Sequence, residues 1–317
     1  MTPVATQHRD KTVDIIIPAF GAGKGLGHSI DAALAQILPP AWVMQLVVVD
    51  DGSPEDITPS LRARYGEAIH IVRHEHNRGR SAARNTGFLF GYGVYVVFLD
   101  ADCVWTDDRA LGRHIAALSA GADVSVGLVG AASTGFWGEY QQAVFLRRIE
   151  AFQNGDLAAL TSANCAVRRT VAGLVGGFDE RFRHYGFEDR DFFLRLQVSG
   201  ARFFLIEDCL VLHQDIMSLA KVSIKMYQAG RYSASIFRLA HPDYYSGTVY
   251  WKLDARAHGF MLRTLAVASR PVLPWIVTLG DVVIAGRGLP MVFKRAWVKI
   301  ASGLSYLQGT CDALKAG

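Results

Sequence analysis

Between residues 13 and 99 the chain repeats one pattern, in which an apolar run of strand length is followed by a turn and then by helical spacing. The runs are Val13–Pro18, Leu46–Val49, Ala68–Val72 and Tyr95–Leu99, and helical spacing follows the first three at 28–36, 54–65 and 81–90. Runs that are apolar on both faces and alternate with helices are typical of parallel strands covered on both sides. The sequence therefore predicts an α/β fold with a mostly parallel central sheet flanked by helices.

Polar turns follow three of these predicted strands, and two of the turns are acidic. They read Pro18-Ala-Phe-Gly21, Asp50-Asp-Gly-Ser53 and Asp100-Ala-Asp102. In open parallel sheets, ligands bind beyond the carboxyl ends of the strands. Two aspartates separated by one residue can reach one hard cation, and Mg²⁺ or Mn²⁺ commonly bridges such carboxylates to phosphates. The alternative is that Asp100 caps the next helix and that Asp102 is solvated.

A second acidic cluster, formed by Glu188, Asp189 and Asp191, lies at the predicted start of a helix. The helix dipole favours acids there, and capping explains one of them. Two adjacent acids after Gly186 exceed what a cap needs, and a carboxylate can accept a proton from a hydroxyl. This cluster is therefore a candidate general base.

The glycine-rich stretch at 21–27 matches no phosphate-binding fingerprint. Lys24 is followed by Gly25 instead of Ser or Thr, and the third glycine of a dinucleotide-binding motif would fall on Leu26. We interpret this stretch as a flexible loop.

Charge separates the C-terminal part of the chain from the rest. Residues 251–317 carry nine Lys/Arg and three Asp, a net charge of +6, so that 1–250 sum to −2 within the total of +4. A membrane-spanning helix there would have to bury Asp281 and Arg287. Apolar segments flanked by cations instead predict helices that lie in the interface of an anionic leaflet, the cations being Arg263, Arg270, Lys294, Arg295 and Lys299. The alternative is a helical cap or a dimerisation surface.

Six segments, in this order, resemble glycosyltransferase family 2 with the GT-A fold. They are DIIIPAF, VVVDDGSPE, NRGRSAARNTGF, VVFLDAD, GGFDERF and FEDRDFFLRLQ, and they close on Val-Leu-His at 211–213. The resemblance implies an inverting transfer of a sugar from a nucleotide diphosphate donor, most commonly a UDP-sugar, to an acceptor hydroxyl. It covers about residues 12–215, and the domain expected from it is 1–215, with a nucleotide-sugar half at 12–105 and an acceptor half at 106–215. A helical, basic, membrane-associating region is expected at 216–317.

The resemblance also implies a role for each matching residue. Contacts to the nucleoside would come from Pro18, Ala19, Phe20, Asp50 and Asp51, and the donor pocket would be lined by Asn77, Gly79 and Arg84. The motif that binds metal and diphosphate would be Asp100, Ala101 and Asp102. Asp189, with Glu188 beside it, matches the catalytic base, and His213 matches a histidine that ligates the metal in some members. From the residues alone, His213 could equally be a core histidine, and Arg84 a helix residue paired with an acid.

Four functions fit this sequence. The main prediction is an inverting glycosyltransferase that uses Mn²⁺ or Mg²⁺ and extends a glycan or lipid-linked acceptor. The alternatives are a polyprenyl-phosphate glycosyl synthase, whose anionic acceptor needs no base, a glycoside hydrolase built on the two acid clusters, and a non-catalytic membrane adaptor. No nucleic-acid partner is expected, and a homo-oligomer is left open.

The predicted location is the cytoplasm, peripheral to the inner face of the cell membrane. The four cysteines have no paired spacing, and the N-terminal segment lacks an apolar signal core.

Overall fold

The computed structural model describes residues 11–315 except 22–24 and 287, and the chain divides into two compact units. The first unit is Met1–Ala132, Gln141–Glu180 and Phe192–Asp215, and the second is Ser133–Tyr140, Arg181–Asp191 and Ile216–Gly317. The predicted division of the chain at residue 215 stays a prediction. Of the flexible loop expected at 21–27, residues 22–24 lie outside the described residues, as does Arg287. The prediction was wrong for residues 25–27, which form the first turn of the helix Gly25–Leu34.

The first unit is built on a mixed sheet with the strand order β3-β2-β1-β4-β7-β6-β8-β5. The strands are β1 (Thr12–Ala19), β2 (Val43–Asp50), β3 (His70–Arg73), β4 (Tyr95–Leu99), β5 (Cys103–Trp105), β6 (Val124–Ala131), β7 (Asn164–Arg168) and β8 (Phe203–His213). The pairs among β1 to β4 are parallel, as is β6 with β8. Strand β7 is antiparallel to both of its neighbours, and β5 is antiparallel to β8. The α/β class is confirmed, and its sheet is more mixed than the periodicity alone predicted.

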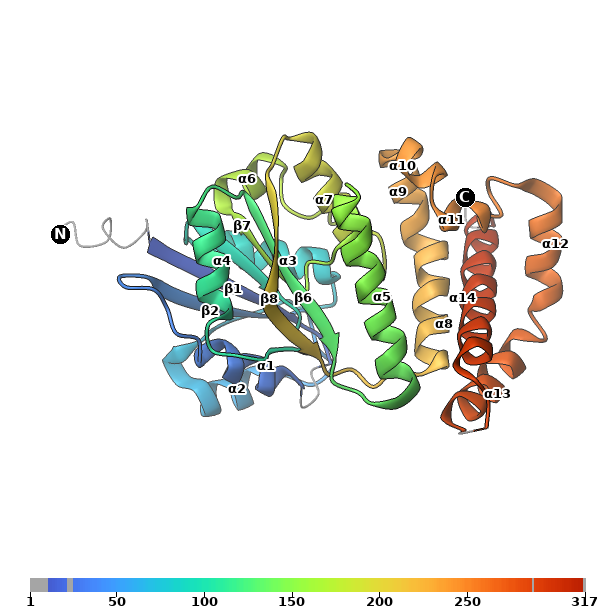
Figure 1. The fold of residues 1–317 in the computed structure, drawn as a ribbon, viewed down its shortest axis with the longest axis horizontal. Helices are drawn as coiled ribbons and strands as arrows, with labels where there is room; N and C mark the ends of the chain where they lie inside the picture. The colour runs from blue at the N-terminus through green and yellow to red at the C-terminus, as the bar shows by residue number, and fades with distance from the viewer. Residues whose placement is uncertain (1–10, 22–24, 287, 316–317) are drawn as a thin grey trace. The chain divides into compact units, whose positions relative to one another are not determined.

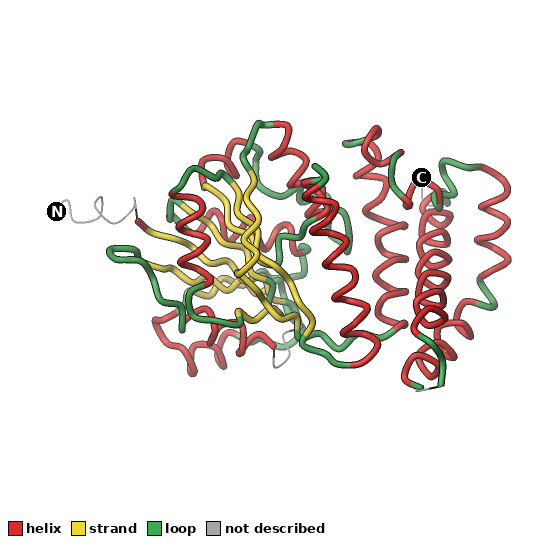
Figure 2. The backbone as a smooth tube through the Cα atoms, viewed as in Figure 1, coloured by secondary structure: helices red, strands yellow, loops and turns green. Residues whose placement is uncertain are grey.

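Helices cover both faces of this sheet, as Figures 1 and 2 show. They are α1 (Gly25–Leu34), α2 (Thr58–Tyr65), α3 (Arg80–Phe90), α4 (Ala110–Ser119) and α6 (Arg169–Leu174). Ile15 of β1 belongs to the large core cluster that also contains Ile30 of α1 and Leu111 of α4. Ile16 points to the other face, where a Cβ added at Gly87 of α3 would lie 2.4 Å from it. Both faces of β1 are therefore buried, which explains why its sequence has no polar face.

The chain passes between the units at several points, two of which lie within helices, namely α5 (Gly135–Gln153) and α7 (Glu188–Val198). The rest of the second unit is helical, which confirms the expected helical C-terminal region. Its elements are α8 (Leu219–Gln228), a π-helical turn (Ala229–Ser233), α9 (Ala234–Ala240), α10 (Pro242–Ser246), α11 (Val249–Lys252), α12 (Gly259–Ser269), α13 (Leu273–Ala285) and α14 (Met291–Ala313).

The second unit has its own core, in which α14 packs against α8, α12 and α13. No single helix in the described part of the chain has the length and apolar character to cross a membrane. The pair α12 and α13, bent by 64°, meets that criterion by length and composition when the two helices are taken together.

Candidate functional site

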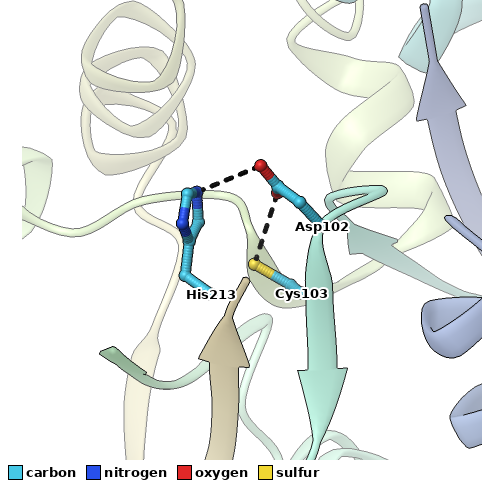
Figure 3. A group of neighbouring side chains, drawn as sticks. All are labelled: Asp102, Cys103 and His213. Atoms are coloured by element: carbon cyan, nitrogen blue, oxygen red, sulfur yellow. Dashed lines mark hydrogen bonds and ion pairs between the residues drawn. The ribbon is translucent and has the colours of Figure 1, made fainter. Parts of the chain in front are cut away.

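The acidic turn after β4 is held against the end of β8. Asp100, Ala101 and Asp102 join β4 to β5, and antiparallel pairing sets Cys103 of β5 opposite His213 of β8. The backbone N–H of Gln214 donates to the carbonyl of Asp102 at 2.8 Å. This pairing brings the Asp102 carboxylate to 3.3 Å from Nε2 of His213 (Figure 3).

Asp102, Cys103 and His213 each offer a ligand atom, and these three atoms lie within 4.8 Å of one another (Figure 3). The side chain of Asp102 is 42% exposed, and that of His213 is 19% exposed. Nδ1 of His213 is buried and has no hydrogen-bond partner among the described residues, whereas Nε2 faces the carboxylate. Carboxylate oxygen and imidazole nitrogen are both ligands that Mn²⁺ accepts. The residues therefore fit a divalent metal.

Cys103 differs from the other two members of this group. Burial raises the pKa of its thiol well above the usual range, and the nearby acids Asp100 and Asp102 raise it further. The thiol therefore keeps its proton, and its Sγ lies 3.9 Å from Oδ1 of Asp102. Since a protonated thiol is a poor metal ligand, the metal-binding chemistry of the group rests on Asp102 and His213.

Asp100 is bound to a buried arginine. Arg84 on α3 is 1% exposed, and its Nη2 donates to Oδ1 of Asp100 at 2.8 Å. Burial by itself would raise the pKa of Asp100, but the guanidinium groups of Arg84 and Arg80 outweigh it, so this pKa is lowered. Burial raises the pKa of Asp102, and the nearby His213 opposes that rise. The two aspartates of one short motif thus have different partners, and their shared role as metal ligands stays a prediction.

The loops after β1 and β2 meet at the same edge of the sheet. Pro18–Phe20 run from the end of β1 into the first loop, with Ala19 buried and the ring of Phe20 54% exposed. Asp50 at the end of β2 is fully buried, accepts a hydrogen bond from the backbone N–H of Ser53 at 2.9 Å, and pairs with Arg73. The Asp50 carboxylate is therefore committed to partners within the protein.

Asp51 organises the loop that precedes α3. Its Oδ1 accepts from the backbone N–H of Arg78 at 2.9 Å and lies 2.7 Å from Nδ1 of His74, while its Oδ2 accepts from the N–H of Gly79 at 2.8 Å. Oδ1 of Asn77 also lies 3.1 Å from that N–H. The structure thus brings Asp51, Asn77 and Gly79 together, and Asp51 is occupied with holding the loop. The expected roles of these residues in donor binding stay a prediction.

Glu188 and Asp189 begin α7 and belong to the second unit. Glu188 is buried, and its Oε2 accepts from the backbone N–H of Gly186 at 3.0 Å, whereas Asp189 is partly exposed. Between them and Gly186, Phe187 has a φ of +71°, a left-handed conformation that bulky residues rarely adopt. Its ring stacks on that of Phe237 at 4.8 Å, which anchors the strained residue.

Two side-chain contacts from the C-terminal helices hold the first turn of α7, and the sequence analysis identified neither. Nε2 of His241 lies 2.8 Å from Oδ1 of Asp191, and Arg190 donates to the hydroxyl of Tyr244 at 2.8 Å. The partners are some fifty residues apart in sequence, so no local pattern could have revealed them. Positioning of the candidate base therefore depends on the helical region as well as on its own motif.

The fold resembles solved glycosyltransferases of the GT-A type. The mannosyltransferase PcManGT from Pyrobaculum calidifontis, solved with GDP-Man and Mn²⁺, has a TM-score of 0.59 and 19% identity over 95% of this chain and 86% of that one. Residues 1–349 of TarS from S. aureus give a TM-score of 0.53 and 15% identity over 96% of this chain and 92% of that one. Together with the acidic motif at the strand ends, this likeness defines a GT-A fold.

The family follows from the sequence match. The model described as Glycosyl transferase family 2 matches residues 14–174, which is half of the chain. The chain therefore belongs to glycosyl transferase family 2, a family of catalytic transferases, and the resemblance found in its motifs is confirmed. This membership sets aside the glycoside hydrolase alternative.

Curated relatives carry related names. The pre-mycofactocin glycosyltransferase of Mycobacterium tuberculosis is 29% identical over 76% of this chain and 50% of its own length. The succinoglycan biosynthesis protein ExoU of Rhizobium meliloti is 29% identical over 62% of this chain and 60% of its own length. An Escherichia coli glucosyltransferase, WfgD, whose name specifies a diphosphoundecaprenol-linked GlcNAc acceptor, is 29% identical over 32% of this chain and 38% of its own length. The chain thus spans about half the length of the pre-mycofactocin glycosyltransferase, and less of WfgD.

Proposed function

We propose that the protein transfers a sugar from a nucleoside diphosphate donor to a hydroxyl of a glycan or lipid-linked acceptor, with inversion at the anomeric carbon. The observation that carries this proposal is the pairing of Asp102 with His213 at the edge where the strands end. The donor class is supported by PcManGT, which was solved with GDP-Man, and by TarS, which was solved with UDP and with UDP-GlcNAc. A UDP-sugar is our first candidate for the donor.

Asp102 and His213 are the residues that would hold Mn²⁺ or Mg²⁺. Such a cation, when bound, supplies positive charge that stabilises a departing diphosphate. Arg84 pairs with Asp100, whose side chain is 22% exposed, so that Asp102, which is 42% exposed, is the more accessible carboxylate of the motif. Nε2 would be the ligand atom of His213, because it is the ring nitrogen that faces the Asp102 carboxylate.

The nucleoside would be contacted by the exposed ring of Phe20, with Pro18 and Ala19 before it, and by the loop at 77–79. Asp51 would act through that loop, because both of its carboxylate oxygens already accept hydrogen bonds from residues 74–79. Asp50 would likewise not contact the nucleoside itself, because its carboxylate pairs with Arg73. These two aspartates are therefore proposed as positioning residues.

In the transfer step, the acceptor oxygen forms a bond to the anomeric carbon as the bond from that carbon to the diphosphate oxygen breaks. Asp189 is proposed to take the hydroxyl proton, and Glu188, held by the N–H of Gly186, to position it. Replacing Asp189 by Asn should abolish transfer to a hydroxyl. If the Asp189→Asn variant stays active, the acceptor is already an anion, and the protein is a polyprenyl-phosphate glycosyl synthase.

The test is a thermal-shift screen against sugar conjugates of UDP, GDP, CDP and dTDP, with and without Mn²⁺. A ligand at one hundred times its Kd stabilises the folded state by about 2.7 kcal/mol, which should raise the melting temperature by several degrees. Asp102→Asn should remove the Mn²⁺-dependent part of the shift. Asp208→Asn is the matched control, because that carboxylate lies on β8 and is 74% exposed.

The proposal fails if Asp102→Asn and the wild type show the same Mn²⁺-dependent shift, or if no sugar nucleotide shifts the wild type. If a donor binds but prolonged incubation with candidate acceptors leaves it intact, the non-catalytic adaptor would be favoured. We further propose that the protein works at the cytoplasmic face of the membrane, where lipid-linked acceptors are found.

A further inference from the structure

Helices α12, α13 and the first half of α14 expose an unusual number of large apolar side chains. Ten of them are between 48% and 85% exposed, and we call this set the apolar face: Phe260, Met261, Leu265, Val267, Trp275, Leu279, Val282, Val292, Phe293 and Ile300. Exposed apolar residues scattered singly need no explanation, but a group on consecutive packed helices indicates an interaction surface.

Helix α13 shows why this face is not an ordinary helix surface. Trp275, Leu279 and Val282 recur at helical spacing on its exposed side, while Gly280 and Ile284 are buried on the other side. A helix at a protein surface normally turns a polar side to water, whereas this one is apolar on both sides. The inward side is already packed in the core of the unit, so the outward side is free of core contacts and can pack against a second apolar environment.

The exposed charges on these three helices are all positive. In the described residues of α12 to α14, the exposed ionisable side chains are Arg263, Arg295 and Lys299. The two acids are engaged within the unit. Asp281 accepts from the backbone N–H of Leu219 at 2.6 Å, and Asp312 pairs with Arg270. The surface formed by the described residues of α12 to α14 therefore carries exposed cations and no exposed carboxylate.

Two of the five cations that the sequence placed beside the apolar segments are not free to contact a membrane. Lys294 is buried, and its Nζ donates to the carbonyls of Ile284 and Gly286 at the end of α13. Arg270 is bound to Asp312. Of the five flanking cations named from the sequence, Arg263, Arg295 and Lys299 are therefore the exposed ones.

We propose that the apolar face binds the interface of an anionic lipid bilayer, with its apolar side chains at the acyl boundary and its three cations among the headgroups. Tryptophan and phenylalanine at such a boundary, flanked by Lys and Arg, are typical of helices that lie in the membrane plane. The proposal concerns membrane binding alone and does not depend on the transferase chemistry.

Charge favours a bilayer over a second copy of the chain as the occupant. A two-fold interface through this face would bring six exposed cations together, three from each copy, with no exposed acid on the described parts of α12 to α14 to pair with them. An anionic leaflet supplies the missing negative charge over the whole surface.

The experiment is co-sedimentation of the full chain with vesicles of phosphatidylcholine alone and with vesicles that also contain about 30 mol% of the anionic lipid phosphatidylglycerol, because anionic headgroups attract exposed cations. We expect binding to the anionic vesicles that exceeds binding to the neutral ones. Each cation near an anionic surface strengthens binding about fivefold, so Arg263→Gln, Arg295→Gln and Lys299→Gln together should weaken it about a hundredfold.

The apolar part is tested by Trp275→Ser with Phe293→Ser, which should weaken binding at least about tenfold. Leu174→Ser with Val198→Ser is the matched control, because these side chains are 75% and 87% exposed on the first unit. The control should bind like the wild type. Circular dichroism and the melting temperature of each variant show that it is folded.

Three outcomes would overturn the proposal. The first is binding that Trp275→Ser with Phe293→Ser leaves unchanged. The second is absence of vesicle binding together with a dimer, seen by sedimentation velocity, that the same variant dissociates, since the face would then bind a second copy. The third is resistance of membrane-bound protein to alkaline carbonate extraction, which would mean that α12 and α13 insert as a bent pair.

Discussion

A buried histidine should make the stability of the first unit depend on pH. His114 on α4 is fully buried, with Nδ1 2.9 Å from the hydroxyl of Ser125 and Nε2 3.1 Å from Oδ1 of Asn164. Burial lowers the pKa of His114 from 6.5 to about 4, and the hydrogen bond to Oδ1 of Asn164 offsets only part of this effect. The folded protein therefore holds a neutral imidazole where the unfolded chain would hold a charged one.

The sign and size of the effect follow from proton linkage. Between pH 6.5 and about 4 the unfolded chain binds a proton at His114 that the folded chain does not, so stability falls as the pH falls through this window. At 1.36 kcal/mol per pH unit, the gap between the two pKa values corresponds to about 3 kcal/mol. This stability is fully present above about pH 7.5 and mostly lost at pH 4.

The assay compares urea unfolding of the wild type and His114→Gln at several pH values from 4 to 8. The stability advantage of the wild type should shrink by about 3 kcal/mol towards pH 4, while contributions from the other acids cancel in the difference. His76→Gln, at an exposed histidine, controls for loss of an imidazole. The reasoning is refuted if the difference does not change with pH, or if NMR shows that the His114 imidazole titrates near 6.5 in the folded protein.

Two further predictions concern stability of the same unit, measured by urea unfolding at pH 7.5. Arg84→Met should cost about 3 kcal/mol, because it removes a buried guanidinium and leaves the carboxylate of Asp100, which is only 22% exposed, without its partner. Arg64→Met, at an exposed ion pair, should cost less than about 1 kcal/mol, and equal effects would contradict this. Gly127→Ala should cost about 2 kcal/mol or more, because its Cβ would lie 2.2 Å from the amide nitrogen of Asn164. Gly112→Ala, in helix α4 where an added Cβ meets only ordinary contacts, should stabilise the protein by about 0.5–1 kcal/mol. A loss of stability in this variant would contradict the packing seen around α4.

The first half of the fold could be predicted because its signals are local. Strands β1 to β4 are apolar on both faces, and their pairing is parallel and close to sequence order. The second half follows long-range pairings that periodicity does not encode. Strand β7 inserts between β4 and β6, and β8 contains the irregular stretch Glu207 to Cys209, where its register with β6 shifts.

For the candidate site, the sequence could predict that the acids gather at one edge of the sheet, but not which side chains pair with them. Strand ends carry the acids to one edge of the sheet, so Asp102 could be identified from its position after an apolar run. The sequence could not show that Arg84 binds Asp100 and that His213 faces Asp102, because each contact depends on a pairing between distant segments. The role of His213 was left open for the same reason.

The buried network around His114 links the long-range strand pairing to the candidate site. The amide of Asn164 donates to the carbonyls of Leu128 and Cys209, on the two strands whose register shifts between Gly127 and Leu128. Beyond that shift, β8 runs in register to His213 opposite Ala131. Loss of the network at low pH, or a side chain at Gly127, should therefore release the segment that holds His213 beside Asp102. We expect metal-dependent donor binding to weaken as the pH falls, before the unit unfolds. In Gly127→Ala it should already be weakened at pH 7.5. Donor binding that follows global unfolding alone would show that the network stabilises the core without positioning the site.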